Sequence, residues 1–463
     1  MPRWNRFRKM SIRLLHYSDI ENACDDPVRM GRLAGTIRSI RGEDTVVAGT
    51  GDNTAPGVLA HYYEGHQAMP FFGAVSTDVE TVGNHDFDFG TAPILDVISK
   101  SPQEWIVANV FEGESEDERG VPFAGLDGTT VLHRDGRRVG FVGVIDPATP
   151  RIAPTGASEL NVTSPVESVW TAVSELGDSV DHFVVLAHLR SDLETAVAAV
   201  EGVDVVLGGH VHTERHEIVD GTLVVRPGAN GQVVWEIELF DGTCSPSATR
   251  HSTAEGPLDE SVADTTREQL ADVGLLETVA TVDDPIHRGL DRRTRGESRV
   301  GNLVADAYRW AADTDVSFVP NGGLREGRPL SGEVTAGEVA SVHPFGGTVE
   351  ALHVTGEQLQ ALLQAAFCPH REDGRLWHGD VSGMTVEYDS AAGRLIGVAV
   401  NGQSLEASRE YSLATNSYVV YSDDWPIPHE TTVESFGLPF KTVADYAREE
   451  GITVPVGGRL QDC

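Results

Sequence analysis

The chain has 463 residues, of which 40% are hydrophobic and 23% are charged. This length is enough for two or three domains with buried cores, and the composition excludes a disordered or fibrous protein. Asp and Glu number 71 against 35 Lys and Arg, which gives a formal net charge of −36. Such an acidic excess argues against a groove for polymeric nucleic acid, because phosphate backbones require clustered Lys and Arg.

The sequence also gives no sign of membrane insertion or secretion. It has no run of about 18 apolar residues, so we expect no membrane span and no membrane partner. Residues 1–13 are basic but lack the apolar stretch of a signal peptide. The four cysteines are scattered, which favours neither a disulfide framework nor a thiolate zinc site. We therefore expect a cytoplasmic protein, and the sequence leaves its oligomeric state open.

The basic residues are unusual in kind, because only three of them are lysines. A high-salt cytoplasm accounts for an acidic, lysine-poor surface, since carboxylates hold water and salt screens their repulsion. We therefore expect a halophilic protein. The alternative is that acidic runs such as residues 112–118 form a patch for a cationic partner.

Between residues 11 and 245, short β-branched apolar runs alternate with loops and with helix-like segments such as residues 91–100. This pattern is typical of buried strands in an α/β fold. The clearest predicted strands are residues 12–16, 45–48, 183–187, 203–207 and 222–225.

The rest of the chain divides into a connector and a second domain. Residues 246–283 are polar and then acidic with helical spacing, so we expect them to link two domains. Residues 284–463 mix strands with helix-like segments at 301–312 and 356–367, which predicts a smaller mixed α/β domain.

Polar residues with metal-binding side chains follow five of the predicted strands of the first domain. In open α/β sheets, sites lie at the carboxyl ends of strands, so these side chains are expected to meet. Glycines precede three of the positions and allow sharp turns that bring ligands close. The polar residues are Asp19, Asp52, Asn53, Asn84, His85, Asp86, His188, His210 and His212.

Carboxylate, amide and imidazole ligands in this mixture suit a pair of divalent metal ions. Two ions about 3.5–4 Å apart need a bridging carboxylate and mixed ligands on each side. Such a pair binds a phosphate oxygen and activates a water for attack on phosphorus. One strand-end His or Asp is usually an ordinary loop residue, but five strands ending alike favour a metal centre.

The same residues carry a resemblance to a known family. Five motifs, in order, resemble the calcineurin-type metallophosphoesterase signature, and residues 87–90 extend the third as in the 5′-nucleotidase branch. Three further segments resemble the 5′-nucleotidase C-terminal domain. The resemblance implies a four-layer αββα catalytic domain followed by a substrate-binding domain. The motifs are residues 18–19, 51–53, 83–86, 187–188, 208–212, 297–306, 321–325 and 344–347.

The resemblance also implies roles for the residues. Asp52 would bridge the two metal ions, with Asn84, His188 and His210 in one site and Asp19 and His212 in the other. His85, held by Asp88, would lie beside the phosphate with Asn84 and stabilise the transition state. A carboxylate beside an imidazole orients the ring and favours its charged form.

One departure from the family concerns the first metal site. The family reads Asp-x-His in the first motif, whereas this chain has Glu21 two residues after Asp19. A carboxylate in place of imidazole is a harder ligand, so we expect two divalent ions of Mn, Mg or Zn, with Mn favoured over Zn. The alternative is that Glu21 turns to solvent and leaves this site weak or empty.

The second domain resembles the part of the family that holds the nucleotide. Arg325 would contact phosphate or carboxylate through its planar fork, and Phe345 and Tyr418 would stack on the base. The loop after Tyr418 departs from the family pattern, and Asp423 would take the role of the aspartate that the family has in this loop. The family's arginine before residue 297 is also displaced. Further candidate substrate contacts are Asn321 and Arg295.

Together these features predict an enzyme that hydrolyses a nucleotide phosphate ester of the 5′-nucleotidase type with metal-activated water. Two alternatives use the same site: a 2′,3′-cyclic nucleotide phosphodiesterase and a nucleotide-sugar pyrophosphatase. A third, from another class, is a nucleotide-binding sensor whose catalytic site has decayed.

Overall fold

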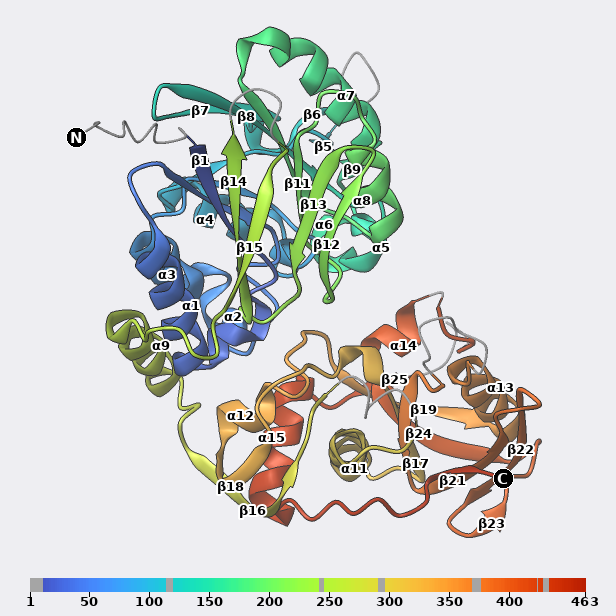
Figure 1. Cartoon of the computed structure of the whole chain (residues 1–463). Coiled ribbons are helices and arrows are strands. Elements are labelled where there is room, and N and C mark those ends of the chain that lie inside the picture. The colour runs from blue at the N-terminus through green and yellow to red at the C-terminus, as the bar shows by residue number, and fades with distance from the viewer. Residues whose placement is uncertain are drawn as a thin grey trace. The chain divides into compact units, whose positions relative to one another are not determined.

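The computed structural model describes residues 11–113, 120–240, 245–289, 296–368, 376–422, 424–427 and 433–463. The chain forms two compact units, Met1–Gln269 and Leu270–Cys463 (Figure 1). Each unit has its own sheets and its own buried cores. No described helix is long and apolar enough to cross a membrane, and the cytoplasmic location stays a prediction.

The first sheet of the N-terminal unit has six strands in the order β15-β14-β1-β2-β3-β4. β1 to β4 run parallel to one another, and β14 and β15 add antiparallel strands at one side. The strands are β1 (Ser11–Tyr17), β2 (Thr45–Thr50), β3 (Val79–Thr81), β4 (Glu104–Trp105), β14 (Val233–Phe240) and β15 (Ser247–Ser252).

The second sheet has the order β12-β13-β11-β10-β8-β7. Its four central strands are parallel, and β12 and β7 close the two edges in antiparallel pairing. The strands are β7 (Thr129–Arg134), β8 (Arg137–Ile145), β10 (His182–His188), β11 (Val205–Gly208), β12 (Glu214–Val219) and β13 (Thr222–Pro227).

The two sheets pack face to face and helices cover their outer faces. Apolar side chains from both sheets form one buried cluster, including Leu14 and Val46 from the first sheet and Val184 and Leu207 from the second. Because the parallel strands are buried on both faces, they read as continuous apolar runs. This confirms the predicted four-layer αββα arrangement. The covering helices include α1 (Pro27–Ile40), α3 (Met69–Val75), α7 (Pro165–Leu176) and α8 (Ser191–Ala198).

The remaining elements of this unit are short, apart from the predicted helix at 91–100, which is confirmed as α4 (Thr91–Lys100). A small three-stranded sheet has the order β6-β5-β9. The bounds are β5 (Val110–Glu112), β6 (Val121–Pro122), β9 (Asn161–Val162), α2 (Ala60–Tyr63), α5 (Thr149–Ile152) and α6 (Pro154–Ala157).

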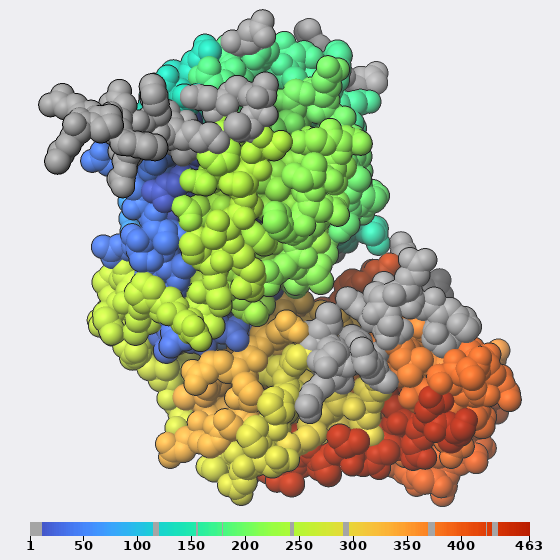
Figure 2. Space-filling view, viewed as in Figure 1, coloured from blue at the N-terminus to red at the C-terminus, as the bar shows by residue number. Residues whose placement is uncertain are grey.

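Residues 246–283, expected as a connector, begin with strand β15 and continue into α9 (Glu260–Asp272). The turn between these elements packs on α1, because a Cβ at Gly31 would lie 2.6 Å from Leu258 Cδ1. Figure 2 shows the yellow-green surface of this segment directly beside the blue surface of the first helices. The first part of the segment is therefore built into the N-terminal unit.

The C-terminal unit contains three sheets, with strand orders β16-β18, β20-β17-β24-β19-β25 and β23-β22-β21-β26. The five-stranded sheet packs on α11, which confirms the helix predicted at 301–312, and α13 confirms the one predicted at 356–367. The strands are β16 (Thr278–Ile286), β17 (Val316–Pro320), β18 (Leu330–Thr335), β19 (Val349–Thr355), β20 (Gly379–Ser382), β21 (Met384–Asp389), β22 (Arg394–Val400), β23 (Gln403–Ser404), β24 (Glu410–Asn416), β25 (Val433–Ser435) and β26 (Leu460–Asp462). The helices are α11 (Arg299–Ala312), α12 (Ala336–Ala340), α13 (Gly356–Ala366), α14 (Ser417–Tyr421) and α15 (Pro439–Glu450).

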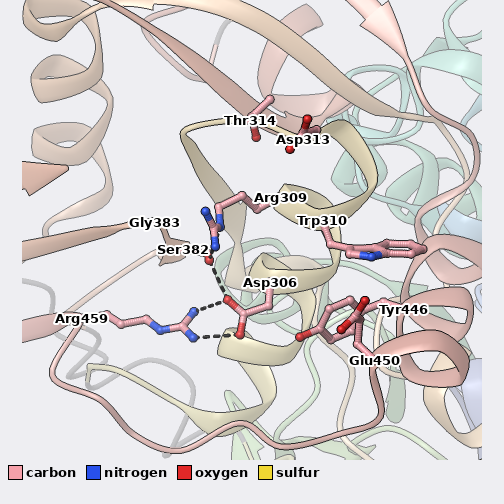
Figure 3. A pocket seen from close by; sticks show the side chains of 10 residues that line it. All are labelled: Asp306, Arg309, Trp310, Asp313, Thr314, Ser382, Gly383, Tyr446, Glu450 and Arg459. Carbon is pink, nitrogen blue, oxygen red and sulfur yellow. Dashed lines mark hydrogen bonds and ion pairs between the residues drawn. The ribbon is translucent and has the colours of Figure 1, made fainter. Parts of the chain in front are cut away.

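The polar residues of segment 297–306 brace α11 against the C-terminal end of the chain. Glu297 accepts hydrogen bonds from Asn302 Nδ2 and Gly457 N, each at 2.7 Å. Asp306 accepts hydrogen bonds from both Nη groups of Arg459 at 2.8 Å, and the two residues line a pocket of about 530 Å³ (Figure 3). The polar residues of this segment, which resembles the 5′-nucleotidase C-terminal domain, therefore stabilise the fold of this unit.

Candidate functional site

The predicted ligand turns all lie at one edge of the N-terminal sandwich. β1, β2 and β3 supply three of them from the first sheet, and β10 and β11 supply the other two from the second. Parallel strands in each sheet end at the same edge, so turns from two facing sheets meet there. Five segments that are far apart in sequence therefore build a single cluster.

Four candidate ligands adopt left-handed backbone conformations, with φ of 49° at Asp19, 48° at Glu21, 52° at Asp52 and 71° at His210. Such conformations cost of order 1–3 kcal/mol each in non-glycine residues and persist only where the surroundings impose them. Several hydrogen bonds do so here: His210 N donates to Asp19 Oδ1 at 3.1 Å, and Glu21 N donates to Asp52 O at 3.2 Å.

Three groups of side chains in this cluster could each hold a metal ion, and two of these groups share no residue. Asp52, His188 and His210 place their ligand atoms within 4.8 Å of one another. Asp19, Glu21 and His212 do the same. Carboxylate oxygens and imidazole nitrogens in this mixture suit Mn, Mg or Zn, so the donor set fits the implied ions.

Glu21 belongs to the cluster and does not turn to solvent. Its residue is 1% exposed, and its Oε1 lies 2.9 Å from Nε2 of His212. The expectation that this side chain turns to solvent is therefore wrong. Asp19 Oδ1 lies 3.9 Å from Nε2 of the same imidazole, so both carboxylates face His212.

The other predicted catalytic residues join the same cluster. His188 Nε2 lies 3.1 Å from Asn84 Oδ1 and 3.2 Å from Asp52 Oδ2. His85 N donates to Asp52 Oδ1 at 2.7 Å, and its Nδ1 lies 3.0 Å from the Asp88 carboxylate. A third group of possible metal ligands consists of Glu21, Asp52 and His85.

The charges of this buried cluster shift the pKa values of their neighbours. Burial raises the pKa of Asp19 to about 7. Burial also opposes protonation of His188, but the adjacent Asp52 carboxylate outweighs it and raises the pKa of that imidazole to about 10. Burial likewise raises the pKa of Asp52, but the charges of His188 and His85 prevail and lower it below its usual range. Bound cations would replace these protons and balance the buried carboxylates.

Metal affinity should therefore rise with pH between pH 6 and 8. Near neutral pH the raised pKa values keep protons on Asp19 and His188 in the metal-free protein, and both groups must lose them to become ligands. Raising the pH removes this competition. Calorimetric titration with Mn²⁺ in buffers of different ionisation enthalpy should show proton release on binding. Affinity that is constant across this range would contradict the prediction.

Two buried carboxylates form hydrogen bonds with the turns that carry the candidate ligands. Asp86 accepts hydrogen bonds from the backbone N–H of Asp52 at 3.0 Å and of Gly83 at 2.7 Å, so it ties two ligand turns together. Glu80 accepts from Tyr17 OH at 2.6 Å and from Asn53 Nδ2 at 2.8 Å. Sequence reasoning missed Glu80 and Tyr17. The available signal was an acidic residue inside an apolar strand.

Two of the predicted glycines are required by close approach. A Cβ at Gly83 would collide with Asp52 Oδ1 and would lie 2.7 Å from His188 Cε1. A Cβ at Gly209 would lie 2.5 Å from Ser18 Oγ and 2.7 Å from Thr50 O. Any side chain at either position would push ligand turns apart.

In the C-terminal unit, the structure brings several predicted substrate residues onto adjoining loops. The Arg325 guanidinium lies 4.4 Å from the centre of the half-buried Phe345 ring. The loop between Phe345 and β19 is joined to the start of α14, because Ser417 N donates to Thr348 O at 2.9 Å. Tyr418, in α14, is 47% exposed.

Asn321 occupies a more interior position than the other predicted contacts. It is 2% exposed, and its Nδ2 donates to Trp377 O at 3.0 Å. Asp423 and Arg295 lie outside the described residues. Arg288, which sequence reasoning did not single out, is buried beside the loops that carry Arg325 and Phe345.

Comparison with protein families gives two matches along the chain. Residues 12–214 match the calcineurin-like phosphoesterase profile, and residues 278–428 match the profile of the 5′-nucleotidase C-terminal domain. The first match contains all the candidate metal ligands, and the second contains Arg325, Phe345 and Tyr418.

Two curated relatives from Bacillus subtilis are much longer than this chain. The chain is 23% identical over 379 residues to the endonuclease YhcR, which covers 74% of this chain and 30% of that protein. It is 23% identical over 466 residues to the trifunctional nucleotide phosphoesterase YfkN, which covers 88% of this chain and 32% of that protein. The chain thus spans about a third of the length of these relatives.

Among solved structures, a 5′-nucleotidase precursor from Thermus thermophilus is similar over nearly its whole length. The alignment has a TM-score of 0.81 and 22% identity, and it covers 98% of this chain and 99% of that one. At this level of identity the likeness is one of fold.

Proposed function

Because the chain belongs to the calcineurin-like phosphoesterases with a 5′-nucleotidase C-terminal domain, we propose that it hydrolyses a nucleotide phosphate ester with two divalent metal ions. Members of this family are phosphoesterase hydrolases that use such ions. The observation that carries the proposal is the cluster in which ligand turns from two sheets bring two groups of candidate metal ligands together.

In the N-terminal unit, Asp52 would bridge the two ions. His188, His210 and Asn84 would complete one site, and Asp19, Glu21 and His212 the other. The bound ions supply a polarised phosphate oxygen and a water of lowered pKa. The three carboxylates favour Mn or Mg over Zn, because hard oxygen ligands suit hard cations.

His85 and Asn84 would contact the phosphoryl oxygens. The Asp88 carboxylate, 3.0 Å from Nδ1, holds the imidazole ring of His85 so that Nε2 is the atom available for substrate. A donor fixed in advance stabilises the charge that develops on the phosphoryl oxygens in the transition state. The hydrogen bond from the backbone N–H of His85 to Asp52 Oδ1 further limits the motion of His85.

In the C-terminal unit, Arg325, Phe345 and Tyr418 would hold the nucleotide. Arg325 covers one face of Phe345, which leaves base stacking to the opposite face of that ring. Stacking on an aromatic ring contributes about 1–3 kcal/mol per base and tolerates different bases. The arginine fork suits a phosphate or carboxylate group.

Replacing Phe345 with Ala should raise KM for AMP by about tenfold or more and leave p-nitrophenyl phosphate much less affected. The change removes the stacking surface without touching the metal ligands. Steady-state kinetics with both substrates measure the effect. Equal losses with both substrates would show that Phe345 does not hold the base.

Hydrolysis of a substrate panel, with the products separated by chromatography, tests the proposed function, because a cyclic phosphodiesterase or a pyrophosphatase releases no inorganic phosphate. AMP, a 2′,3′-cyclic nucleotide, UDP-glucose and p-nitrophenyl phosphate are each assayed with Mn, Mg, Zn or chelator, in molar KCl because the net charge is −36. Metal-dependent release of phosphate from AMP is the expected result. Failure of every substrate, with two metal ions bound, would contradict the proposed substrate class.

The alternatives predict different results from the same panel. A 2′,3′-cyclic phosphodiesterase would turn over the cyclic nucleotide but not AMP, and a pyrophosphatase would prefer UDP-glucose. The similarity to YfkN, a trifunctional nucleotide phosphoesterase, supports a panel with more than one type of nucleotide ester. A decayed sensor would bind nucleotide without releasing phosphate.

A further inference from the structure

Arg288 joins two loops of the C-terminal unit through one buried guanidinium. It lies two residues beyond the end of β16 and is 4% exposed. Its Nε donates to the carbonyl of Arg325 at 3.2 Å. Its Nη1 donates to Ser341 Oγ at 3.0 Å, and its Nη2 donates to the carbonyl of Ser341.

The two loops carry the side chains that we propose for nucleotide binding. One ends at Arg325, and the other runs from Ser341 to Phe345. A backbone hydrogen bond from Arg325 N to Val342 O, at 2.9 Å, also joins them. The Arg325 guanidinium then lies 4.4 Å from the centre of the Phe345 ring. The distance between the two loops thus determines whether the Arg325 guanidinium can contact the Phe345 ring.

His343 fills the space between the loops. Its ring lies 5.8 Å from that of Phe345, and a Cβ at Gly323 would lie 2.6 Å from its Nε2. Burial, assisted by the charge of Arg325, lowers the pKa of His343 to about 4, so the ring packs as a neutral group. Because the ring of His343 is neutral, the charged hydrogen bonds between the loops come from Arg288.

The site around Arg288 is shaped for a planar group with several donors. A guanidinium offers five N–H groups in a fixed fork, whereas a lysine ammonium offers one nitrogen. Gly327 lies against the fork, since a Cβ there would be 2.6 Å from Nη1. A buried charge is costly unless it is hydrogen-bonded, and here three acceptors on two loops meet it.

We propose that Arg288 is a positioning residue that sets the Arg325–Phe345 pair for nucleotide binding. This inference rests on the proposed function, because it needs Arg325 and Phe345 to contact the nucleotide. Arg288 itself is buried and acts through the two loops.

Arg288→Lys and Arg288→Gln in the full chain test the proposal. KM for AMP should rise about tenfold in both variants, while kcat changes less than about twofold, because the metal ligands are untouched. Equilibrium binding of AMP in the presence of chelator should weaken by a similar factor. Arg394→Gln, an exposed arginine of β22, is the matched control and should leave both measurements unchanged.

Arg325→Ala and Phe345→Ala separate the two possible failures. If these variants weaken AMP binding but folded Arg288 variants do not, the positioning role is overturned and the proposed function stands. If none of the variants changes AMP binding, the proposed nucleotide site fails and the inference fails with it. A fall in both kcat and thermal stability, without a change in KM, would also overturn the positioning role.

Ser341→Ala keeps the proposal falsifiable if the Arg288 variants do not fold. This change removes the Oγ acceptor of Arg288 and the local hydrogen bond from Oγ to Glu338 O, but it keeps the two carbonyl acceptors of Arg288, so we expect a smaller loss of AMP affinity, of about threefold. Unchanged AMP affinity in a folded Ser341→Ala protein, with unfolded Arg288 variants, would overturn the proposal.

Discussion

Replacing Asp52 with Asn should abolish phosphoester hydrolysis and remove most of the bound metal. Asp52 faces both proposed metal sites: its Oδ2 lies 3.2 Å from His188 Nε2, and it shares a second ligand group with Glu21 and His85. Asn keeps the size and one oxygen of Asp but loses the charge and the second oxygen. A ligand shared by two cations would need that negative charge, and a neutral amide would hold both ions less tightly.

Metal content by elemental analysis and phosphate release, measured on the same preparation, check this prediction. Asp264→Asn is a matched control, because Asp264 lies in α9 with 61% of its side chain exposed. The control should retain both metal and activity. Near-normal turnover by Asp52→Asn would contradict the two-metal proposal, whatever the metal content.

The candidate metal centre was predictable because its ligands follow apolar strands in a fixed order. Strand-end positions converge in a parallel sheet, so the positions of His188 and His210 after their strands predicted that these two side chains meet. The residues alone did not show that these strands belong to two facing sheets. The family resemblance supplied that arrangement.

The features that sequence reasoning missed depend on long-range packing. The left-handed backbone at Asp19, Glu21 and Asp52 is imposed by hydrogen bonds to distant turns, and no local motif specifies it for these residue types. Glu80 and Arg288 each join segments that are separated in sequence. A single buried Glu or Arg gives no pattern by which its partners could be found.

The family-like segment 297–306 shows a different limit. It lies within the match to the 5′-nucleotidase C-terminal domain, but the described polar side chains of Glu297, Asn302 and Asp306 are engaged in bracing α11. A motif therefore marks a family without distinguishing residues that hold the fold from residues that face a substrate.

Replacing His85 with Ala should retain the bound metals and lower kcat by about 10²-fold or more. The proposed role of His85 is a transition-state contact, and loss of one such contact costs about 10²–10³ in kcat. Its Nδ1 is held by Asp88 at 3.0 Å, so Asp88→Asn should cause a smaller loss by freeing the ring. His133→Ala, at an exposed position of β7, is the matched control.

Metal content decides between the two roles that the geometry allows His85. Its ligand nitrogen lies within 4.8 Å of ligand atoms of Glu21 and Asp52, so it could hold an ion instead of a phosphoryl oxygen. A transition-state role predicts full metal content, a low kcat and a KM that changes little. Loss of one metal ion from His85→Ala would instead make His85 a ligand. In that case Asn84 would be the remaining candidate for the phosphoryl contact among the described residues of this turn.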